Sequence, residues 1–466
     1  MNRNLARLAE ETHERRGDYP ALLFEGRWHS SRELFERAQR VAAGLVARGV
    51  GPGDRVVVQM ENSPDVPIAY QAIWRAGAVV TPAIFLLTAE EFERLVADAE
   101  PALVLTPETF AELEVDDVCP IVPRADDDLA ALVYTGGTTG RAKGVMLTHA
   151  NLYEAGRRGH EAGHVAGLDR SLTSLPLAHS YGLLVLNVGL HHPDKPQGVL
   201  MRWFDPETWL ELAQEHAIQI AAVVPSMLYL LLQQPLEAFD LSALRYVACG
   251  AAPLAREAIE AFVRRVPGVE IREGYGLTES SALVATNRPG RVRYGTVGVP
   301  VPGTDVRIVD GEICVRSELV MQGYWREPEL TAQTVRDGWL ATGDMGRLDG
   351  DGYLTIVDRK KDLIIRGGFN VFPRDVEEAL LEHPAIATAC VVGRPDRVHG
   401  EEVVAFVTLS EEVATEELVA FGRRRLGGYK YPREIHVLDA LPLTAVGKAD
   451  REALRERLAL HEGTVR

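Results

Sequence analysis

Apolar positions between residues 30 and 290 recur in two alternating patterns. The segment ELFERAQRVAAGLVARG has apolar residues at helical spacing, follows a capping signal at Ser30 and Glu33, and ends at Gly49. The next segment, RVVVQM, predicts a short β-branched strand. The same order returns in IAYQAIWRAGA with VVTPA and in WLELAQEHAI with QIAAVVP. This alternation predicts an α/β architecture with parallel strands and crossover helices.

After about residue 290 the pattern changes to short strands separated by turns, in VRIVDGEICVR and DGYLTIVDRKKDLIIRGG. Such strands favour an antiparallel sheet or a small barrel beside the large α/β region. We therefore predict a large N-terminal domain of layered α/β sheets over residues 1–361, with a small β-barrel-like subdomain. A smaller α+β domain is expected over residues 362–466.

The composition is that of a globular protein, with 466 residues, 46% of them hydrophobic and 25% charged. This excludes a disordered or fibrous chain. The net charge of -17, from 67 acidic and 50 basic residues, would repel phosphate backbones and anionic membranes. We therefore expect no nucleic-acid partner, and any bound anion must be held by a local site.

Cysteine usage and hydropathy indicate a cytoplasmic protein. The four cysteines lie far apart and form no CxxC pair, so we expect buried thiols at Cys119, Cys249, Cys314 and Cys390. The charged, helical start differs from a signal peptide. The most apolar window, residues 217–232, is interrupted by Gln219 and Pro225 and is too short for a transmembrane segment, so we expect it in the core.

The most informative segment is LVYTGGTTGRAKGVMLTH, residues 132–149. Glycines let backbone N–H groups approach phosphate oxygens, threonines add hydroxyl donors, and a lysine adds charge. These residues are Thr135, Gly136, Gly137, Thr138, Thr139, Gly140, Lys143 and Gly144. A Walker P-loop is excluded, because Gly144 follows the lysine where a Ser or Thr should hold magnesium.

This string resembles the phosphate loop of the adenylate-forming superfamily, which includes acyl- and aryl-CoA synthetases, adenylation domains of peptide synthetases and luciferases. Seven further motifs of that superfamily follow in the same order: LPLAHSYG, GAAPL, EGYGLTES, GEICVRSELVMQGYW, TGD, DRKKDLIIRGGFNVFP and PLTAVGKADR. The resemblance covers essentially the whole chain, which is identified as a member of the AMP-dependent synthetase and ligase family.

The resemblance implies a reaction in two steps. A carboxylate attacks the α-phosphorus of ATP to give acyl-AMP and pyrophosphate, and a thiol, here coenzyme A, then expels AMP. Both partners of the first step are anions, so the site must neutralise charge and align the attack. Mg²⁺ and lysines are therefore expected, and the resemblance implies that the C-terminal domain rotates between the steps.

The resemblance also implies residue roles. Catalysis would involve Lys448, Glu279, Thr139 and His179, with Glu279 and Thr139 at the magnesium. ATP or AMP would be bound by Thr135, Gly136, Gly137, Thr138, Thr139, Gly140, Lys143, Gly250, Ala251, Ala252, Tyr275, Gly276, Thr278, Asp344 and Arg359. The hinge would be Lys361, the CoA channel Gly367, Gly368, Phe369 and Lys430, and the acyl pocket His179, Ser226, Cys249, Gly274 and Ala282.

Alternatives remain for the acceptor and for the activity. The chain could load an acyl carrier protein instead of CoA, or act as a non-catalytic nucleotide sensor, although a sensor needs no Lys448. Small and apolar pocket residues favour a fatty or other hydrophobic acid. Arg288, Arg291 and Arg293 would instead suit a second carboxylate. The polar segment 190–198 could shape an entrance or contact a second subunit in a homodimer.

Overall fold

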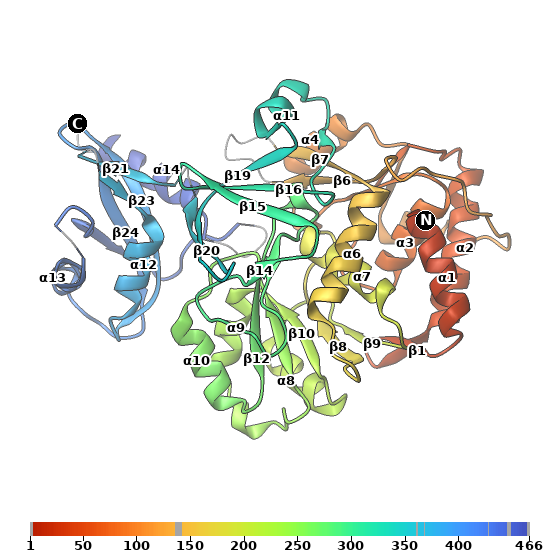
Figure 1. The fold of residues 1–466 in the computed structure, drawn as a ribbon, viewed down its shortest axis with the longest axis horizontal. Helices are drawn as coiled ribbons and strands as arrows, with labels where there is room; N and C mark the ends of the chain where they lie inside the picture. Colours follow the sequence, from red (N-terminus) through yellow and green to blue (C-terminus); the bar gives the residue numbers. More distant parts are fainter. Residues whose placement is uncertain are drawn as a thin grey trace. The chain divides into compact units, whose positions relative to one another are not determined.

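The protein is described by a computed structural model and has two compact units (Figure 1). The structure describes residues 3–135, 142–359, 362–367, 369–426, 428–444 and 449–463. The large unit comprises Met1–Val306, Val315–Ala341 and Asp349–Leu354, and the small unit Arg307–Cys314, Thr342–Leu348 and Thr355–Arg466. The α/β class, with a large domain and a smaller C-terminal one, is confirmed.

The larger sheet of the large unit has nine strands in the order β14-β13-β12-β11-β10-β8-β9-β1-β2. Their bounds are β1 Pro20–Phe24, β2 Arg27–Ser30, β8 Arg170–Thr173, β9 Gln197–Leu200, β10 Ile220–Val223, β11 Tyr246–Cys249, β12 Glu270–Tyr275, β13 Ala285–Thr286 and β14 Val299–Pro300. Strands β1, β9, β8, β10, β11 and β12 run parallel, as the crossover pattern predicts. Their carboxyl ends therefore lie at one edge.

A second, six-stranded sheet has the order β17-β7-β6-β4-β3-β5. It comprises β3 Arg55–Val58, β4 Val79–Pro82, β5 Leu103–Leu105, β6 Leu129–Thr135, β7 Lys143–Thr148 and β17 Gly323–Tyr324. Strands β6 and β7 pair antiparallel, with Thr135 opposite Lys143. The glycine-rich segment thus joins two strands of one hairpin.

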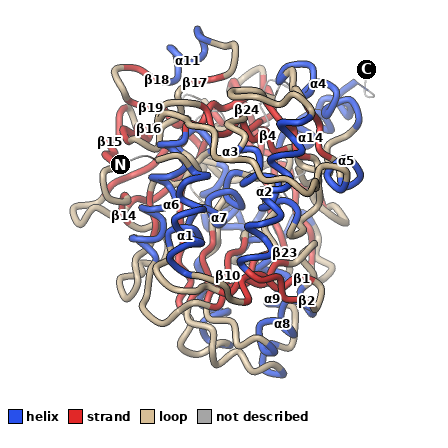
Figure 2. The backbone as a smooth tube through the Cα atoms, turned by 90° about the vertical axis from the view of Figure 1, so that its right-hand side faces the viewer, coloured by secondary structure: helices blue, strands red, loops and turns tan. Residues whose placement is uncertain are grey.

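Helices of the large unit pack on these sheets (Figures 1 and 2). They are α1 Leu5–Arg16, α2 Ser31–Ala47, α3 Asp65–Arg75, α4 Ala89–Ala99, α5 Pro107–Ala111, α6 His149–Gly163, α7 Ser180–His191, α8 Pro206–Glu215, α9 Pro225–Leu232, α10 Arg256–Arg265 and α11 Pro328–Thr334, with short 3₁₀ turns at Leu236–Ala238 and Thr278–Ser280. One apolar core includes residues of α1, α2, α3, β3 and β4, and a second lies among α8, α9, α10 and β10–β12.

Strands of a five-stranded sheet belong partly to each unit. Its order is β15-β16-β19-β18, and β20 pairs with β19. The strands are β15 Thr304–Val309, β16 Glu312–Ser317, β18 Val335–Arg336, β19 Trp339–Leu348 and β20 Leu354–Arg359. An antiparallel sheet or a small barrel was expected for this region, and the strands form a sheet.

The small unit has its own sheet, in the order β22-β21-β24-β23, with β25 beside β24. Its elements are β21 Ile364–Arg366, β22 Phe369–Val371, β23 Ile386–Asp396, β24 Gly400–Leu409, β25 Glu434–Val437, α12 Pro373–Leu381, α13 Thr415–Arg425 and α14 Arg451–Gly463. Apolar residues on both faces of β23 and β24 form two cores. This unit therefore has hydrophobic cores of its own.

Local sequence signals account for several element ends. The Ser30 hydroxyl accepts from the Glu33 N–H at 3.1 Å, and Asp205 caps α8 by accepting from the Thr208 N–H at 2.8 Å.

All four cysteines are buried and form no disulfide bonds, as predicted. The expectation that residues 217–232 are all core is wrong for Tyr229 and Leu230, which are 38% and 42% exposed, because only one face of α9 packs inward.

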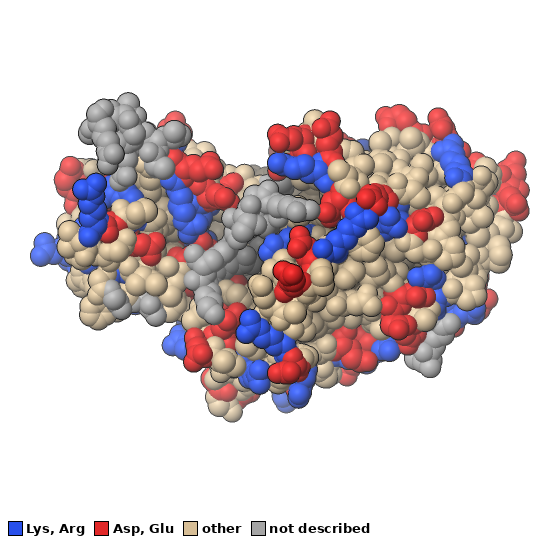
Figure 3. All heavy atoms as spheres, turned by 90° about the horizontal axis from the view of Figure 1, so that it is seen from above, with Lys and Arg blue, Asp and Glu red and all other residues tan. Residues whose placement is uncertain are grey.

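The surface carries charges of both signs. Figure 3 shows acidic and basic side chains intermixed on the face it draws, and both units carry surface ion pairs, Arg202 with Glu25 and Arg425 with Glu382. Among the described residues, no helix is long and apolar enough to cross a membrane.

Candidate active site

The predicted motif residues of the large unit follow the carboxyl ends of neighbouring parallel strands. His179 follows β8, Ser226 follows β10, Gly250 follows β11, and Tyr275 ends β12. Strands β8, β10, β11 and β12 are adjacent in the sheet, so the topology brings these segments to one edge. Ligands of α/β sheets bind at such an edge.

The EGYGLTES segment turns back on itself directly after β12. Gly276 allows this turn, because a Cβ there would lie 2.2 Å from the backbone carbonyl of Ala282. Ser281 and Ala282 adopt positive φ angles of 53° and 64°. Such conformations cost free energy for L-residues and persist only when the surroundings hold them, which is common at functional sites.

Glu279, the predicted magnesium ligand, is half-buried and held from two sides. Its carboxylate accepts from the Tyr324 hydroxyl at 2.8 Å, and its backbone carbonyl accepts from the Met321 N–H at 2.8 Å. Burial and the Glu279 carboxylate raise the pKa of Tyr324, so the phenol stays protonated and donates. Ser281 adds a hydrogen bond of 2.9 Å to the carbonyl of Leu319.

Lys143 and Glu279 lie near the same aromatic side chain. The Lys143 Nζ is 5.5 Å from the centre of the Tyr324 ring, whose hydroxyl binds Glu279. Strand β17, which contains Tyr324, pairs antiparallel with β7, and the Trp325 N–H donates to the carbonyl of Gly144 at 2.7 Å. The hairpin of the glycine-rich segment and the turn after β12 are thus joined through β17.

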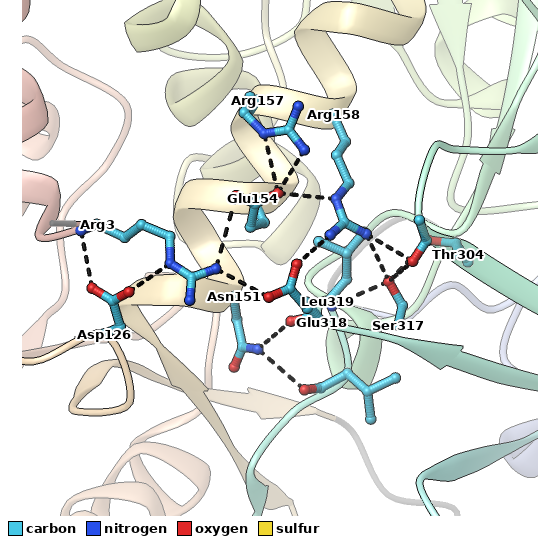
Figure 4. Close-up of polar contacts among 12 residues, drawn as sticks. Arg3, Asp126, Asn151, Glu154, Arg157, Arg158, Thr304, Ser317, Glu318 and Leu319 are labelled. Atoms are coloured by element: carbon cyan, nitrogen blue, oxygen red, sulfur yellow. Dashed lines mark hydrogen bonds and ion pairs between the residues drawn. The ribbon is translucent and has the colours of Figure 1, made fainter. Parts of the chain in front are cut away.

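A charge network centred on the buried Arg158 fixes the chain just before β17 (Figure 4). Arg158 of α6, whose side chain is 4% exposed, donates to Glu154 at 3.1 Å and to Glu318 at 2.6 Å. Asn151, one helical turn before Glu154, donates to the carbonyls of Glu318 and Val320. Because Met321 binds the Glu279 backbone, this network supports the position of Glu279 from α6.

Residues predicted for the acyl pocket lie at the same strand ends. Cys249 is buried at the end of β11, and burial raises the pKa of its thiol. A Cβ at Gly250 would approach the carbonyl of Gly274 to 3.2 Å. His179 caps α7, because its Nδ1 accepts from the Tyr181 N–H at 3.2 Å. The histidine thus has a structural role beside the gating role implied by the motif.

The structure also gives the contacts or backbone conformation of several other residues predicted to bind nucleotide. The Thr278 hydroxyl donates to the Ser180 hydroxyl at 3.2 Å, which ties the turn after β12 to the start of α7. Ala251, between Gly250 and Ala252, has a φ of 72°. Thr135 and Lys143 face each other across the base of the hairpin.

Two of the three arginines considered for a second substrate carboxylate, Arg288 and Arg293, have protein partners. Arg293 binds Asp349 at 2.6 Å and Asp351 at 2.9 Å, while the Arg288 guanidinium donates to the carbonyl of Pro300 at 3.4 Å. The polar segment 190–198 runs from the end of α7 into the start of β9, so it lies at the amino edge of the parallel strands. The motif edge is the opposite one, which argues against an entrance role for this segment, while its contact with a second subunit stays a prediction.

Four predicted residues of the small unit have defined surroundings. Asp344 of β19 is buried, at 3% exposed, and its N–H donates to the Thr342 hydroxyl at 3.1 Å. Gly367 has a φ of 58° at the turn before β22, and Phe369 is 58% exposed beside the ring of Tyr429 at 4.9 Å. Lys430 donates to Asp375 at 2.6 Å, and this hydrogen bond raises its pKa.

Several predicted residues lie outside the described part of the chain. These are Gly136, Gly137, Thr138, Thr139, Gly140, Lys361, Gly368 and Lys448, and the Arg359 side chain is likewise not described. Their roles stay predictions. Within the described residues, no group of three or more His, Cys, Asp or Glu side chains could hold a metal ion by itself.

Sequence reasoning missed two contributors to the site. Tyr324 lies in the quoted motif GEICVRSELVMQGYW but received no role, and Arg158 lies in no motif. For Tyr324, the sequence offers one signal of a functional role, which is the aromatic pair Tyr324–Trp325 at the end of that motif. Nothing in the spacing of α6 indicates that Arg158 contacts residues beyond position 300.

The fold and the motif edge define an adenylate-forming enzyme. A family model described as AMP-binding enzyme matches residues 9–121 and 109–325, and one described as AMP-binding enzyme C-terminal domain matches 375–448. The chain belongs to this AMP-binding enzyme family, and its class is that of an AMP-forming acid–thiol ligase, as the motifs predict.

Named relatives extend along the whole chain. It is 34% identical to a long-chain-fatty-acid–CoA ligase of Bacillus subtilis, over 98% of this chain and 94% of the relative, and 36% identical to a feruloyl-CoA synthase of Amycolatopsis, over 91% and 93%. An ATP-bound crystal structure of MatB from Rhodopseudomonas palustris matches with a TM-score of 0.91 at 31% identity, over 98% and 99% of the two chains.

Proposed function

We propose that the protein is an ATP-dependent carboxylate–CoA ligase that forms acyl-AMP and then acyl-CoA from a hydrophobic carboxylic acid. The observation that carries this proposal is that Lys143 and Glu279, which lies in the turn after β12, both contact the side chain of Tyr324. One cation and one carboxylate suit a substrate that combines phosphates with a metal ion.

The donor set fits Mg²⁺ bound together with nucleotide. Mg²⁺ prefers oxygen ligands and is commonly held by one or two carboxylates and substrate phosphates, so one fixed carboxylate at Glu279 is sufficient protein charge. Thr139 would add a hydroxyl. The ion would neutralise pyrophosphate charge as it develops. Tyr324 keeps the Glu279 carboxylate oriented, and Lys143 lowers the repulsion between the two anionic substrates.

The acyl end of the site favours an uncharged substrate tail. The pocket segments contribute the small or apolar residues Ser226, Cys249, Gly274 and Ala282. A second carboxylate would need a cationic partner to compensate its desolvation. Arg293 already binds two aspartates, and Arg288 a backbone carbonyl. The relatives named for long-chain fatty acids and for ferulate are consistent with this class.

Residues of the small unit would serve both steps. Lys448 would serve acyl-AMP formation, and the segment around Gly367 and Phe369 would admit the pantetheine arm of CoA. Gly367 carries no side chain that could obstruct the arm, and it has a positive φ that glycine adopts readily. The four cysteines are buried and form no disulfide bonds, which fits a protein of the reducing cytoplasm.

The test is a pyrophosphate exchange assay over a panel of carboxylic acids, followed by product analysis with CoA. Exchange stimulated by fatty or aryl acids, and acyl-CoA formation on adding CoA, are expected. Exchange with dicarboxylates alone would refute the substrate class. Exchange without acyl-CoA, but with transfer to a carrier protein, would refute CoA as the acceptor, and no exchange with any acid would favour the nucleotide sensor.

A further inference from the structure

Two contacts that hold Glu279 come from one short stretch of chain. The Met321 N–H donates to the backbone carbonyl of Glu279 at 2.8 Å, and the Tyr324 hydroxyl donates to its carboxylate at 2.8 Å. We call residues 317–324 the strap, because they lie beside the turn that contains Glu279 and end in β17. The orientation of the Glu279 carboxylate therefore depends on what holds the strap.

The backbone of the strap is bonded on one side to α6 and on the other to the turn after β12. Asn151 of α6 donates to the carbonyl of Glu318 at 2.6 Å and to that of Val320 at 3.2 Å. The carbonyl between them, that of Leu319, accepts from the Ser281 hydroxyl at 2.9 Å. The strap thus links α6 to the turn that contains Glu279.

Arg158 of α6 binds the beginning of the strap (Figure 4). Its guanidinium donates to the Glu318 carboxylate at 2.6 Å, to the Ser317 hydroxyl at 3.1 Å and to the carbonyl of Gly303 at 3.0 Å. Its Nε donates to Glu154, one helical turn earlier, at 3.1 Å. The Arg158 side chain is only 4% exposed, so water and salt weaken these bonds little. The planar fork of an arginine can hold this many acceptors at once, whereas the single ammonium of a lysine cannot.

The neighbouring Arg157 differs from Arg158 in one useful respect. It also binds Glu154, at 2.8 Å, and it binds Glu161 at 3.0 Å. Both partners belong to α6, and the Arg157 side chain is 43% exposed. The two arginines therefore share a helix and a partner, but the hydrogen bonds to the strap described above come from Arg158.

We propose that Arg158 is a positioning residue for the Glu279 carboxylate and thereby sets the magnesium concentration at which the protein binds ATP. This inference rests on the proposed function, in which Glu279 holds magnesium together with the nucleotide. Residues that orient a metal-binding carboxylate through its partners commonly change metal affinity when they are replaced. Without the Arg158 contacts the start of the strap is less restrained, so Met321 and Tyr324 hold Glu279 less firmly.

The test is a calorimetric titration of the full chain with ATP at several magnesium concentrations, without carboxylic acid or CoA. Arg158→Met should need at least about fivefold more magnesium than the parent for half-maximal ATP binding. Arg157→Met is the matched control and should stay within about twofold of the parent, because it removes contacts within α6 only. Arg158→Lys should lie between the two, since an ammonium replaces only part of the hydrogen bonds. An equal magnesium requirement in Arg158→Met and Arg157→Met would overturn the proposal.

Hydrogen exchange followed by mass spectrometry separates local positioning from a general loss of stability. In Arg158→Met, exchange should be at least about fivefold faster in peptides that cover residues 276–283 and 317–324, whereas peptides from α8 and α10 should stay within about twofold of the parent. Faster exchange spread evenly over the large unit would show that Arg158 stabilises the whole unit. The positioning role would then be refuted.

Glu318→Ala loosens the strap while Arg158 keeps its partner Glu154. The Glu318 side chain is 56% exposed, so this variant should fold even if Arg158→Met does not. Its magnesium requirement should rise about two- to threefold, because the half-exposed ion pair is one of several contacts that hold the strap. An unchanged requirement in folded Glu318→Ala would contradict the proposal.

Because the titration needs no turnover, the outcomes for this inference and for the ligase activity can be told apart. Magnesium-dependent ATP binding without pyrophosphate exchange would refute the ligase, and the role of Arg158 would still be decided by the variants. Pyrophosphate exchange by the parent, with one magnesium requirement for all variants, would refute the role of Arg158 alone. A parent protein whose ATP binding needs no magnesium would overturn both.

Discussion

The large and the small unit hold their predicted functional residues in different ways. In the large unit the residues follow the ends of adjacent parallel strands, and Glu279 is fixed by Tyr324, Met321 and the network around Arg158. In the small unit Asp344 is also buried, but Phe369 is 58% exposed and Lys430 is half-buried in an ion pair with Asp375. Rigid support of this kind suits groups that must align reacting atoms, whereas exposed groups suit binding that is made and broken during turnover.

The largest expected effect tests the fixed carboxylate of the large unit. Glu279→Gln should reduce pyrophosphate exchange about a thousandfold, because a neutral amide binds a hard cation poorly. The thermal transition should stay near that of the parent, since the amide still accepts from Tyr324. Exchange at the parent rate would mean that Glu279 does not bind magnesium.

The next prediction asks whether a residue of the small unit serves one step only. Lys448→Ala should lower acyl-AMP formation about a hundredfold and leave thioester formation from supplied acyl-AMP within about twofold. The two half-reactions are measured separately by exchange and by release of CoA thiol. Equal loss in both would contradict a division of labour between the steps.

Acid should destabilise the large unit through histidines whose pKa values are lowered by full or partial burial. Burial lowers the pKa of His149 from 6.5 to about 4, and the pKa values of His160 and His191 are also lowered to about 4. The unfolded chain therefore binds more protons between pH 6.5 and 4, so stability falls as the pH falls. For His149 alone the loss reaches about 2 kcal/mol at pH 5.

Urea unfolding of the parent and of His149→Gln at pH 7.5 and 5.0 measures this effect. The variant cannot bind a proton at that position, so its stability should change less between the two pH values. An identical change in both proteins would show that His149 does not contribute to the acid sensitivity.

The smallest expected effect concerns a positioning residue. Tyr324→Phe removes the hydrogen bond to Glu279 but keeps the ring beside Lys143. Exchange should fall about tenfold, and the magnesium concentration for half-maximal rate should rise. A purely structural role would lower the thermal transition and leave the magnesium dependence unchanged. Phe110→Leu, at a buried position of the same unit, serves as the control for packing loss.

Much of the local structure was predictable because its causes lie within a few residues. Ser30 and Asp205 begin helices as their side chains indicate, and the alternation of apolar segments gave the parallel strands. Lys430 shows the limit of such reasoning, since its partner Asp375 lies 55 residues away. The exposed Tyr229 and Leu230 show it too, because a wholly apolar segment does not say which of its faces packs inward.

The sequence by itself determined the family and the reaction class and predicted the segments of the candidate site, because motif spacing and short-range capping are properties of the chain. Only the tertiary structure decided that Tyr324 binds Glu279 across 45 residues and that Arg158 binds Glu318 across 160. It also decided that α1, α2, α3 and α7 leave a pocket with mainly apolar walls between them. Contacts between distant segments depend on how whole helices and sheets pack, and no local pattern records that packing.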